Sequence, residues 1–148
     1  MPIAKRVDRV VPTPGHPGCA VGVCDPQRTQ GLKAPAPQGT HNLVSLKGPG
    51  LFLSANVTKQ GGQTGLTFVR LDIDGRNVVN LSFAAARNWG LSQPNPYGLQ
   101  LLSGIGVESF AIGWPFPLTF KRSLTLSAAV NETGVVQIVA NVVHASSG

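Results

Sequence analysis

The amino-acid sequence predicts an all-β protein, an antiparallel β-sandwich behind an extended N-terminal arm. Proline and glycine are frequent in residues 1–40, whereas residues 41–148 consist of short runs of Val, Leu, Ile, Phe and Thr separated by Gly, Pro and Asn. Several of these runs alternate apolar and polar residues with the period of two that is typical of a half-buried strand. We therefore divide the chain into an arm, residues 1–40, and one β-sandwich domain, residues 41–148.

The arm is defined by its prolines. Seven of the 12 prolines in the chain lie within the first 37 residues. Proline fixes φ and removes a backbone donor, so it excludes a regular helix and an interior strand. The arm also has more apolar residues than a solvating linker needs, which favours an arm that becomes ordered by lying on a neighbouring protein.

About eight strands are expected in the sandwich domain. Asp74-Gly75 suits a tight hairpin turn, and Asn131-Glu132-Thr133-Gly134 is expected to join the last two strands as a second hairpin. Nine segments are candidates for these strands: 42–47, 51–58, 65–74, 77–84, 98–103, 106–113, 117–121, 123–131 and 135–144; residues 84–87 fit one helical turn. Eight short strands spaced by about ten residues favour two packed antiparallel sheets, arranged as a jelly roll.

Charge is scarce and unevenly distributed. Hydrophobic residues make up 42% of the chain and charged residues 12%, which favours association with other proteins. The net charge is +6. Residues 1–47 contribute +4 of it, because they contain six Lys or Arg and two Asp. These charges are too scattered for a nucleic-acid footprint, so nucleic acid is not the expected partner. No apolar run is long enough to span a bilayer and no signal peptide is visible, so we expect a soluble protein made in the cytoplasm, without membrane contact.

The residues for acid–base chemistry are few. The chain has three His and six carboxylates, and no Gly-x-Ser-x-Gly motif for a nucleophile. His16 and His41 lie in or at the end of the arm, and His144 lies at the end of the last strand. We therefore expect no enzyme and no cofactor.

His16, Cys19 and Cys24, followed by His41, form the strongest metal pattern. Cys-x4-Cys is looser than the two-residue gap of most zinc knuckles, and the chain has a single such pair. Two reduced, packed thiols are the favoured interpretation. A disulfide between Cys19 and Cys24 is sterically possible, and zinc is the least favoured of the three.

Three other segments invite functional interpretations. Residues 72–77 resemble the opening of a calcium loop but lack its sixth-position glycine and its late Glu, so a hairpin is favoured. Residues 61–65 are glycine-rich but precede a strand and lack the Lys-Ser/Thr of a phosphate loop, so a flexible turn is favoured. Four aromatic residues lie near loops, where they can stack on sugars but more often pack the ends of a sandwich: Trp89, Tyr97, Trp114 and Phe116.

Three segments carry a resemblance to a known family: residues 50–59 (GLFLSANVTK), the hairpin of residues 68–83, and the Pro/Gly-rich arm before both. In this architecture the chain resembles the small decoration or cement proteins of tailed-phage capsids, many of which are jelly-roll or related β-sandwich domains with an extended terminal arm. The resemblance implies dimers or trimers on the capsid surface of the virion, assembled in the host cytoplasm. It also implies that each copy clasps neighbouring subunits of the major capsid protein against the pressure of packaged DNA.

The arm supplies the expected partner contacts. Apolar anchors are Ile3, Val7, Val10 and Val11, and Lys5, Arg6 and Arg9 lie between them. Two other binding functions remain open. A carbohydrate- or receptor-binding module of a phage tail or fibre would place Trp89, Tyr97 and Trp114 at one exposed loop end. A jelly-roll coat protein of a small virus would direct the basic arm inward to nucleic acid.

Overall fold

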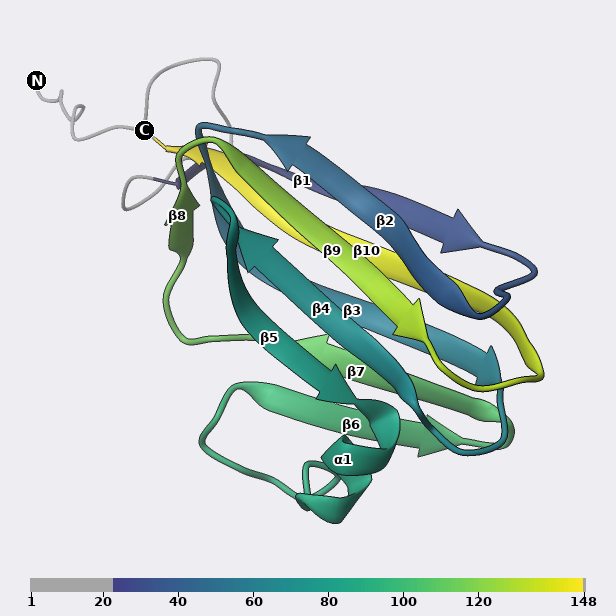
Figure 1. Cartoon of the computed structure of the whole chain (residues 1–148). Coiled ribbons are helices and arrows are strands. Elements are labelled where there is room, and N and C mark those ends of the chain that lie inside the picture. The colour runs from purple at the N-terminus through teal and green to yellow at the C-terminus, as the bar shows by residue number, and fades with distance from the viewer. Residues whose placement is uncertain (1–22, 148) are drawn as a thin grey trace, which may run out of the picture.

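A computed structural model describes residues 23–147 and contains two antiparallel β-sheets packed face to face (Figure 1). Ten strands and one short helix follow one another: β1 (Val23–Lys33), β2 (Gly39–Lys47), β3 (Gly50–Gly61), β4 (Thr67–Ile73), β5 (Arg76–Ser82), α1 (Phe83–Asn88), β6 (Leu99–Gly104), β7 (Val107–Ile112), β8 (Leu118–Phe120), β9 (Ser123–Val130) and β10 (Val135–Ser147). The all-β prediction is confirmed, with ten strands in residues 23–147 where about eight were expected.

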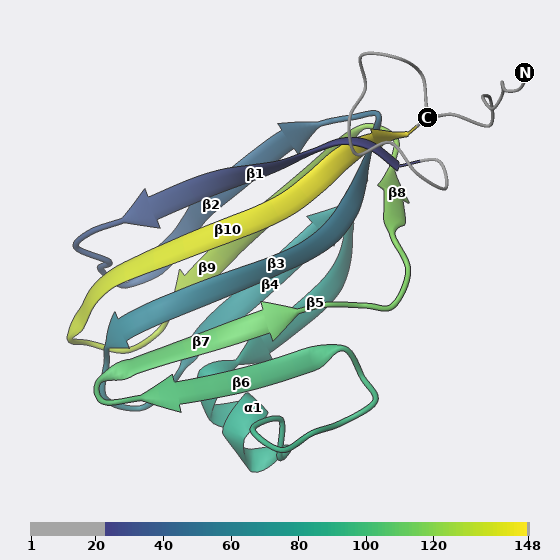
Figure 2. The same cartoon turned by 180° about the vertical axis from the view of Figure 1, so that it is seen from behind.

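The larger sheet has the strand order β1-β10-β3-β7-β6, and β8 pairs with the start of β3. β3 and β10 form its centre and run antiparallel, from Gly61 opposite Val135 to Leu51 opposite Ala145. β7 pairs with residues 55–60 of β3, and β8 pairs with residues 50–52. β7 and β8 therefore pair with successive parts of the same edge of β3. Figure 2 shows the outer face of this sheet, which the helix α1 does not cover.

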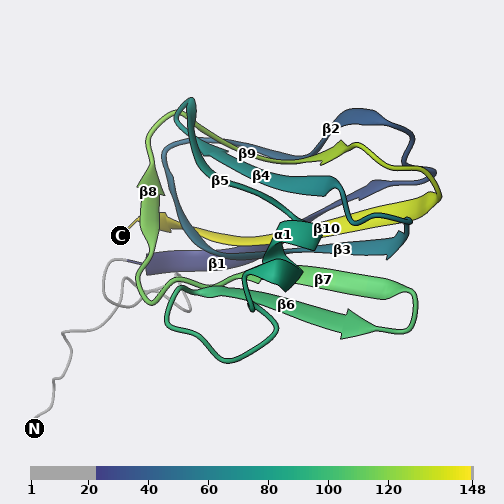
Figure 3. The ribbon, with the colours of Figure 1, turned by 60° about the horizontal axis from the view of Figure 1, so that its bottom comes forward.

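The smaller sheet has the order β2-β9-β4-β5. β9 pairs with β2 on one side and with β4 on the other, so its inward side chains lie in the middle of the sandwich. Figure 3 shows the two sheets as separate layers, with α1 beside β5 and β6.

Side chains from both sheets fill the space between the layers. Side chains along a strand point alternately to the two faces of its sheet. The inward-facing residues of β9 include Leu124, Leu126 and Ala128, and those of β10 include Ile138, Ala140 and Val142. Four phenylalanines are almost completely buried between the sheets: Phe52, Phe83, Phe110 and Phe120. Burial of each such side chain contributes roughly 1.5–3 kcal/mol, which makes this core the main source of stability.

The Asp74-Gly75 turn joins β4 and β5, as predicted, with φ angles of 52° and 81°. This hairpin also accounts for residues 72–77, which resembled a calcium loop. Asp74 itself reaches the connection between β8 and β9. Its carboxylate accepts hydrogen bonds from the backbone N–H groups of Lys121, Arg122 and Ser123 at 2.7–3.0 Å. These bonds lower the pKa of Asp74 to about 2 and tie the hairpin to a segment that crosses between the sheets.

Residues 131–134 do not close a hairpin, so this prediction is wrong. Gly134 does have a positive φ of 82°, but β9 and β10 belong to different sheets. β9 pairs with β2 and β4, whereas β10 pairs with β1 and β3, so the two strands lie on opposite sides of the core. The connection is therefore a crossover between the layers at one end of the sandwich.

The predicted arm is also too long. Residues 23–33 form β1, which pairs with β10 from Val23 opposite Ser147 to Lys33 opposite Ile138. Pro26 lies where the register shifts between Cys24 and Gln27. Proline excludes an interior strand, but an edge strand tolerates it at such an irregularity. Residues 1–22 of the predicted arm lie outside the described residues.

The single helix α1 confirms the helical turn predicted at residues 84–87. Ser82 caps it by accepting a hydrogen bond from the Ala85 N–H, and Phe83 and Ala86 bury its inner face. In residues 23–147 no helix has the length and apolar content needed to cross a membrane.

A close approach between the edge strands β1 and β2 allows a test of this arrangement. A Cβ atom on Gly31 of β1 would lie 1.8 Å from the carbonyl oxygen of Leu43 in β2. We expect Gly31→Ala to push the two edge strands apart and to lower the free energy of unfolding by about 2 kcal/mol. Chemical denaturation measures this. Gly113→Ala is the control, because no atom lies within 4 Å of its Cβ position, and its effect should stay within about 1 kcal/mol. Equal stability of the two variants would contradict the close approach.

Candidate functional site

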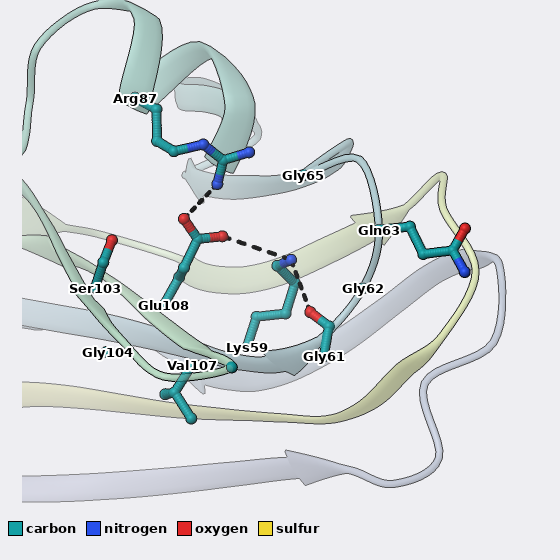
Figure 4. A pocket seen from close by; sticks show the side chains of 11 residues that line it. Lys59, Gly61, Gly62, Gln63, Gly65, Arg87, Ser103, Gly104, Val107 and Glu108 are labelled. Carbon is teal, nitrogen blue, oxygen red and sulfur yellow. Dashed lines mark hydrogen bonds and ion pairs between the residues drawn. The ribbon is translucent and has the colours of Figure 1, made fainter.

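Three connections and the helix meet at one end of the sandwich, around a pocket of about 260 Å³ (Figure 4). The pocket lies between the end of β3, the glycine-rich residues 61–65, Arg87 of α1 and the β6–β7 turn. Backbone hydrogen bonds join these parts: Gly61 N–H donates to the Gly106 carbonyl at 3.0 Å, and Gly62 N–H donates to the Gly134 carbonyl at 2.9 Å. This end contains most of the buried charge in the described residues.

Glu132, in the β9–β10 crossover, is the centre of the site, and its side chain is fully buried. Its Oε1 atom accepts hydrogen bonds from the backbone N–H groups of Gln63, Thr64 and Gly65, at 2.8, 3.0 and 3.0 Å. Its Oε2 atom accepts a hydrogen bond from the Thr67 hydroxyl at 2.6 Å. The glycine-rich segment is therefore a carboxylate-binding loop, and the carboxylate that it binds comes from the same chain.

Lys59 supplies the opposite charge. Its ammonium group lies 3.3 Å from Glu132 Oε2 and 3.7 Å from Glu108 Oε1, and donates a hydrogen bond to the Gly61 carbonyl at 3.0 Å. The Phe83 ring lies 5.2 Å from the same nitrogen, within the range of a cation–π contact. Only 3% of the lysine is exposed, so these contacts replace nearly all of its hydration.

Arg87 closes the network from the helix. Its guanidinium forms an ion pair with Glu108 Oε2, on the solvent side of Lys59. Glu108 therefore lies between two cations, and the two cations and two carboxylates of the cluster cancel in charge. Because each carboxylate is held by a cation, the arrangement supports one chemical role best: it fixes the connections that meet at this end.

The pKa of Glu132 reflects this environment. Burial raises the pKa, but the hydrogen bonds from Thr67, Gly65 and Thr64, together with the charge of Lys59, outweigh burial and leave it below the ordinary value of 4.5. Glu132 therefore remains ionised in the folded protein at neutral pH.

Two glycines of the loop are required by this packing. A Cβ atom on Gly62 would lie 2.5 Å from Glu132 Oε1 and 2.8 Å from Lys59 Nζ, and the φ of Gly62 is +92°. A Cβ atom on Gly65 would lie 2.4 Å from Arg87 Nη2, at a φ of +75°. The sequence analysis interpreted this segment as a flexible turn, whereas it is shaped closely around two ion pairs.

Most of the residues that the sequence predicted as site residues belong to the part of the chain that the structure does not describe. Ile3, Lys5, Arg6, Val7, Arg9, Val10, Val11, His16 and Cys19 lie outside the described residues. Cys24 is buried on β1 and is disulfide-bonded, so its thiol is not free, in contrast to the favoured prediction. The His41 ring donates a hydrogen bond to the Pro37 carbonyl at 2.7 Å. Within residues 23–147 no group of three or more His, Cys, Asp or Glu is placed to hold a metal ion.

The loop aromatics divide into two groups. Trp89 and Tyr97 stack on each other, with ring centroids 6.2 Å apart and planes 11° apart, and are 66% and 60% exposed. Trp114 does not join them, because it packs edge-on against Phe52 in the core, with centroids 5.6 Å apart. The expected cluster of three exposed aromatics is thus a pair.

The charged cluster was not predicted from the sequence, although one signal was present. Lys59 follows Ala55 and Val57 in the inward phase of a strand, where a charged side chain needs a buried partner. The partners of Lys59 could not be identified from the sequence, because Glu108 and Glu132 lie far from it along the chain. No protein-family model matches this chain, and no curated protein matches its sequence.

The buried ion pair generates a stability prediction. Removal of one partner leaves the other charged and buried, so Glu132→Gln and Lys59→Met should each lower the free energy of unfolding by about 3–5 kcal/mol. The double variant should lose less than the sum of the two. Denaturation of all four proteins in a double-mutant cycle measures the coupling, and additive losses would contradict the direct pairing.

The same variants have a predicted pH dependence. The pKa of Glu132 is lower in the folded than in the unfolded protein, so its contribution is complete above about pH 4.5 and is lost as the pH falls through the folded value. Glu132→Gln should therefore be less sensitive to acid than the wild type in this range. Asp72→Asn is the control, because this carboxylate lies on β4 outside the charged cluster and accepts a hydrogen bond from the Asn77 amide, and this variant should keep the acid sensitivity of the wild type.

Proposed function

We propose that the protein is a capsid decoration protein, which clasps neighbouring subunits of a phage major capsid protein and stabilises the shell. The observation that carries this proposal is a sandwich fixed at both ends. Glu132 ties the connections at one end, and Asp74 ties the β4–β5 hairpin to residues 121–123 at the other. A unit closed in this way resists distortion, as a clamp between subunits must.

We further propose that the sandwich is a jelly roll. The strand pairs are nested along the chain: β1 with β10, β2 with β9, β3 with β7 and β8, and β4 with β5. A long hairpin rolled into two four-stranded sheets has this nested order, with β7 and β8 counted as one strand. β6 is then an additional edge strand, and the eight-strand prediction applies to the remainder.

The arm would supply the contact with the shell. β1 begins at Val23, beside the end of β10 and at the end of the sandwich where Asp74 lies, and the arm precedes it in the sequence. This segment contains the four apolar anchors Ile3, Val7, Val10 and Val11, with Lys5, Arg6 and Arg9 between them. Apolar residues ordered on a neighbouring subunit would add buried area, and repetition over a lattice would multiply a modest affinity.

Deletion of residues 1–18 tests the arm. This deletion keeps both cysteines and all of β1, so the free energy of unfolding should change by less than about 0.5 kcal/mol. Occupancy on purified capsids stripped of the protein should fall by about tenfold or more, since the anchors are lost. A co-sedimentation assay measures occupancy, and unchanged occupancy would remove the arm from the mechanism.

Two full-length variants separate the contributions within the arm. One replaces Ile3, Val7, Val10 and Val11 by Ser, and the other replaces Lys5, Arg6 and Arg9 by Gln. The apolar variant should lose occupancy at every salt concentration. The basic variant should lose it mainly at low ionic strength, where charge attraction between the arm and the shell is strongest.

The exposed aromatic pair favours a second candidate function, carbohydrate binding by a module of a phage tail or fibre. Trp89 and Tyr97 present flat apolar faces to solvent, and Trp89 borders a hollow of about 340 Å³ with Leu81, Ala85 and Asn88. Apolar faces and a neutral amide suit the C–H and hydroxyl groups of a sugar ring.

A glycan array tests this second function. The wild-type protein should bind a restricted set of glycans, and Trp89→Ala and Tyr97→Ala should each weaken that binding by about tenfold or more. Phe116→Ala is the control, because Phe116 is an exposed aromatic outside the stacked pair. Binding that survives both substitutions, or no binding by the wild type, would exclude this pair as a sugar site.

A further inference from the structure

The outer face of the larger sheet is a broad surface with almost no charge. Its central row crosses five strands in register: Gln30, Asn141, Asn56, Ala111 and Gln100. The row on one side contains Val139 and Thr58, and the row on the other contains Val143 and Ser54. Arg28, on the edge strand, is the only charged residue in the three rows. Figure 2 views this face, where β1, β10, β3, β7 and β6 lie side by side.

We propose that this face binds the same face of a second copy of the protein, around a two-fold axis. The inference goes beyond the proposed function, because it concerns the isolated protein and requires no shell. It rests on three properties of the face: its charge, its hydrogen-bonding groups and its size.

Charge selects this face over the other. The chain has a net charge of +6, so two copies repel each other and can associate only where cations are scarce. The outer face of the smaller sheet presents three charged residues instead, Lys47, Arg70 and Asp72, which would have to lose hydration in such a contact. In an interface around a two-fold axis the same surface meets itself, so it must be self-complementary. A face without charge meets no like charge on the second copy.

The central row also carries four side-chain amides, those of Gln30, Asn141, Asn56 and Gln100. Side-chain amides carry both donors and acceptors, so a row of Asn and Gln can pair with a copy of itself that runs in the opposite direction. Val139 and Val143, in the rows on either side, would add apolar contacts.

The size of the face fits a reversible dimer. Five strands spaced by about 4.8 Å are about 24 Å wide, and three rows spaced by about 6.8 Å are about 20 Å long, giving a footprint of about 480 Å² on each copy. This is at the small end of specific interfaces, where association is weak and reversible. We therefore expect dissociation in the micromolar range rather than a permanent dimer.

Sedimentation of the full-length protein, from about 10 µM to about 500 µM at physiological salt, tests the proposal. The wild type should shift from monomer to dimer over this range. Ala111→Arg places a charge in the central row of both copies and should weaken association by about tenfold or more. Ala129→Arg is the matched control, because Ala129 has the equivalent outward position on β9 of the smaller sheet, and it should dimerise as the wild type does.

A second variant covers the case in which Ala111→Arg is poorly folded. Gln30 lies in the same row on the exposed edge strand β1, where Gln30→Lys leaves the core unchanged. It should also weaken association, by a smaller factor. A wild type that stays monomeric throughout the range would overturn the proposal, as would dimers of Ala111→Arg and Gln30→Lys that are as stable as those of the wild type. Loss of shell binding alone would leave these sedimentation results unchanged, so failure of this inference and failure of the proposed function are distinguishable.

Discussion

The architecture depends on one carboxylate bound by backbone amides. Glu132 lies in the crossover from β9 to β10, and the amides that it accepts from belong to the crossover from β3 to β4. Both connections pass between the sheets at the same end, so this contact fixes the relative positions of the two layers there. Burial of a carboxylate is unfavourable unless a cation compensates it, and Lys59 is that cation. The lysine, in turn, is stable in the inward phase of β3 only because Glu132 and Glu108 face it.

The opposite end uses similar chemistry in a different environment. Asp74 also accepts hydrogen bonds from three consecutive backbone N–H groups, those of residues 121–123. It is half-buried, so solvent reaches and screens its charge, and no buried cation is needed. Four of the six carboxylates in the chain are Glu132, Glu108, Asp74 and Asp72. The first three form hydrogen bonds or ion pairs that join separate segments of the chain. In residues 23–147 these three carboxylates and their partners thus lie at the ends of the sandwich, away from the outer face of the larger sheet, which is nearly neutral.

The strands were largely predictable because their signal is local. Alternation with a period of two marked β3, β9 and β10, and Asp74-Gly75 marked the β4–β5 hairpin. β1 was missed because the proline argument excludes interior strands only, and Pro26 lies on an edge. Residues 131–134 show a different limit, since a turn sequence does not specify whether the flanking strands join the same sheet. The charged site needs contacts between Lys59 and residues far along the chain, and periodicity contains no information on such pairs.

Rigidity has a consequence for association under the proposed function. A protein that orders itself on binding loses conformational entropy, which subtracts from the free energy of the contact. Here the sandwich is already fixed at both ends by Glu132 and Asp74, so residues 23–147 would lose little conformational entropy on a shell. The outer face of the larger sheet is likewise formed before any partner arrives. Two weak contacts, one through the arm and one between copies, would then reinforce each other on a lattice. Formation of either contact would raise the effective concentration of the groups that form the other.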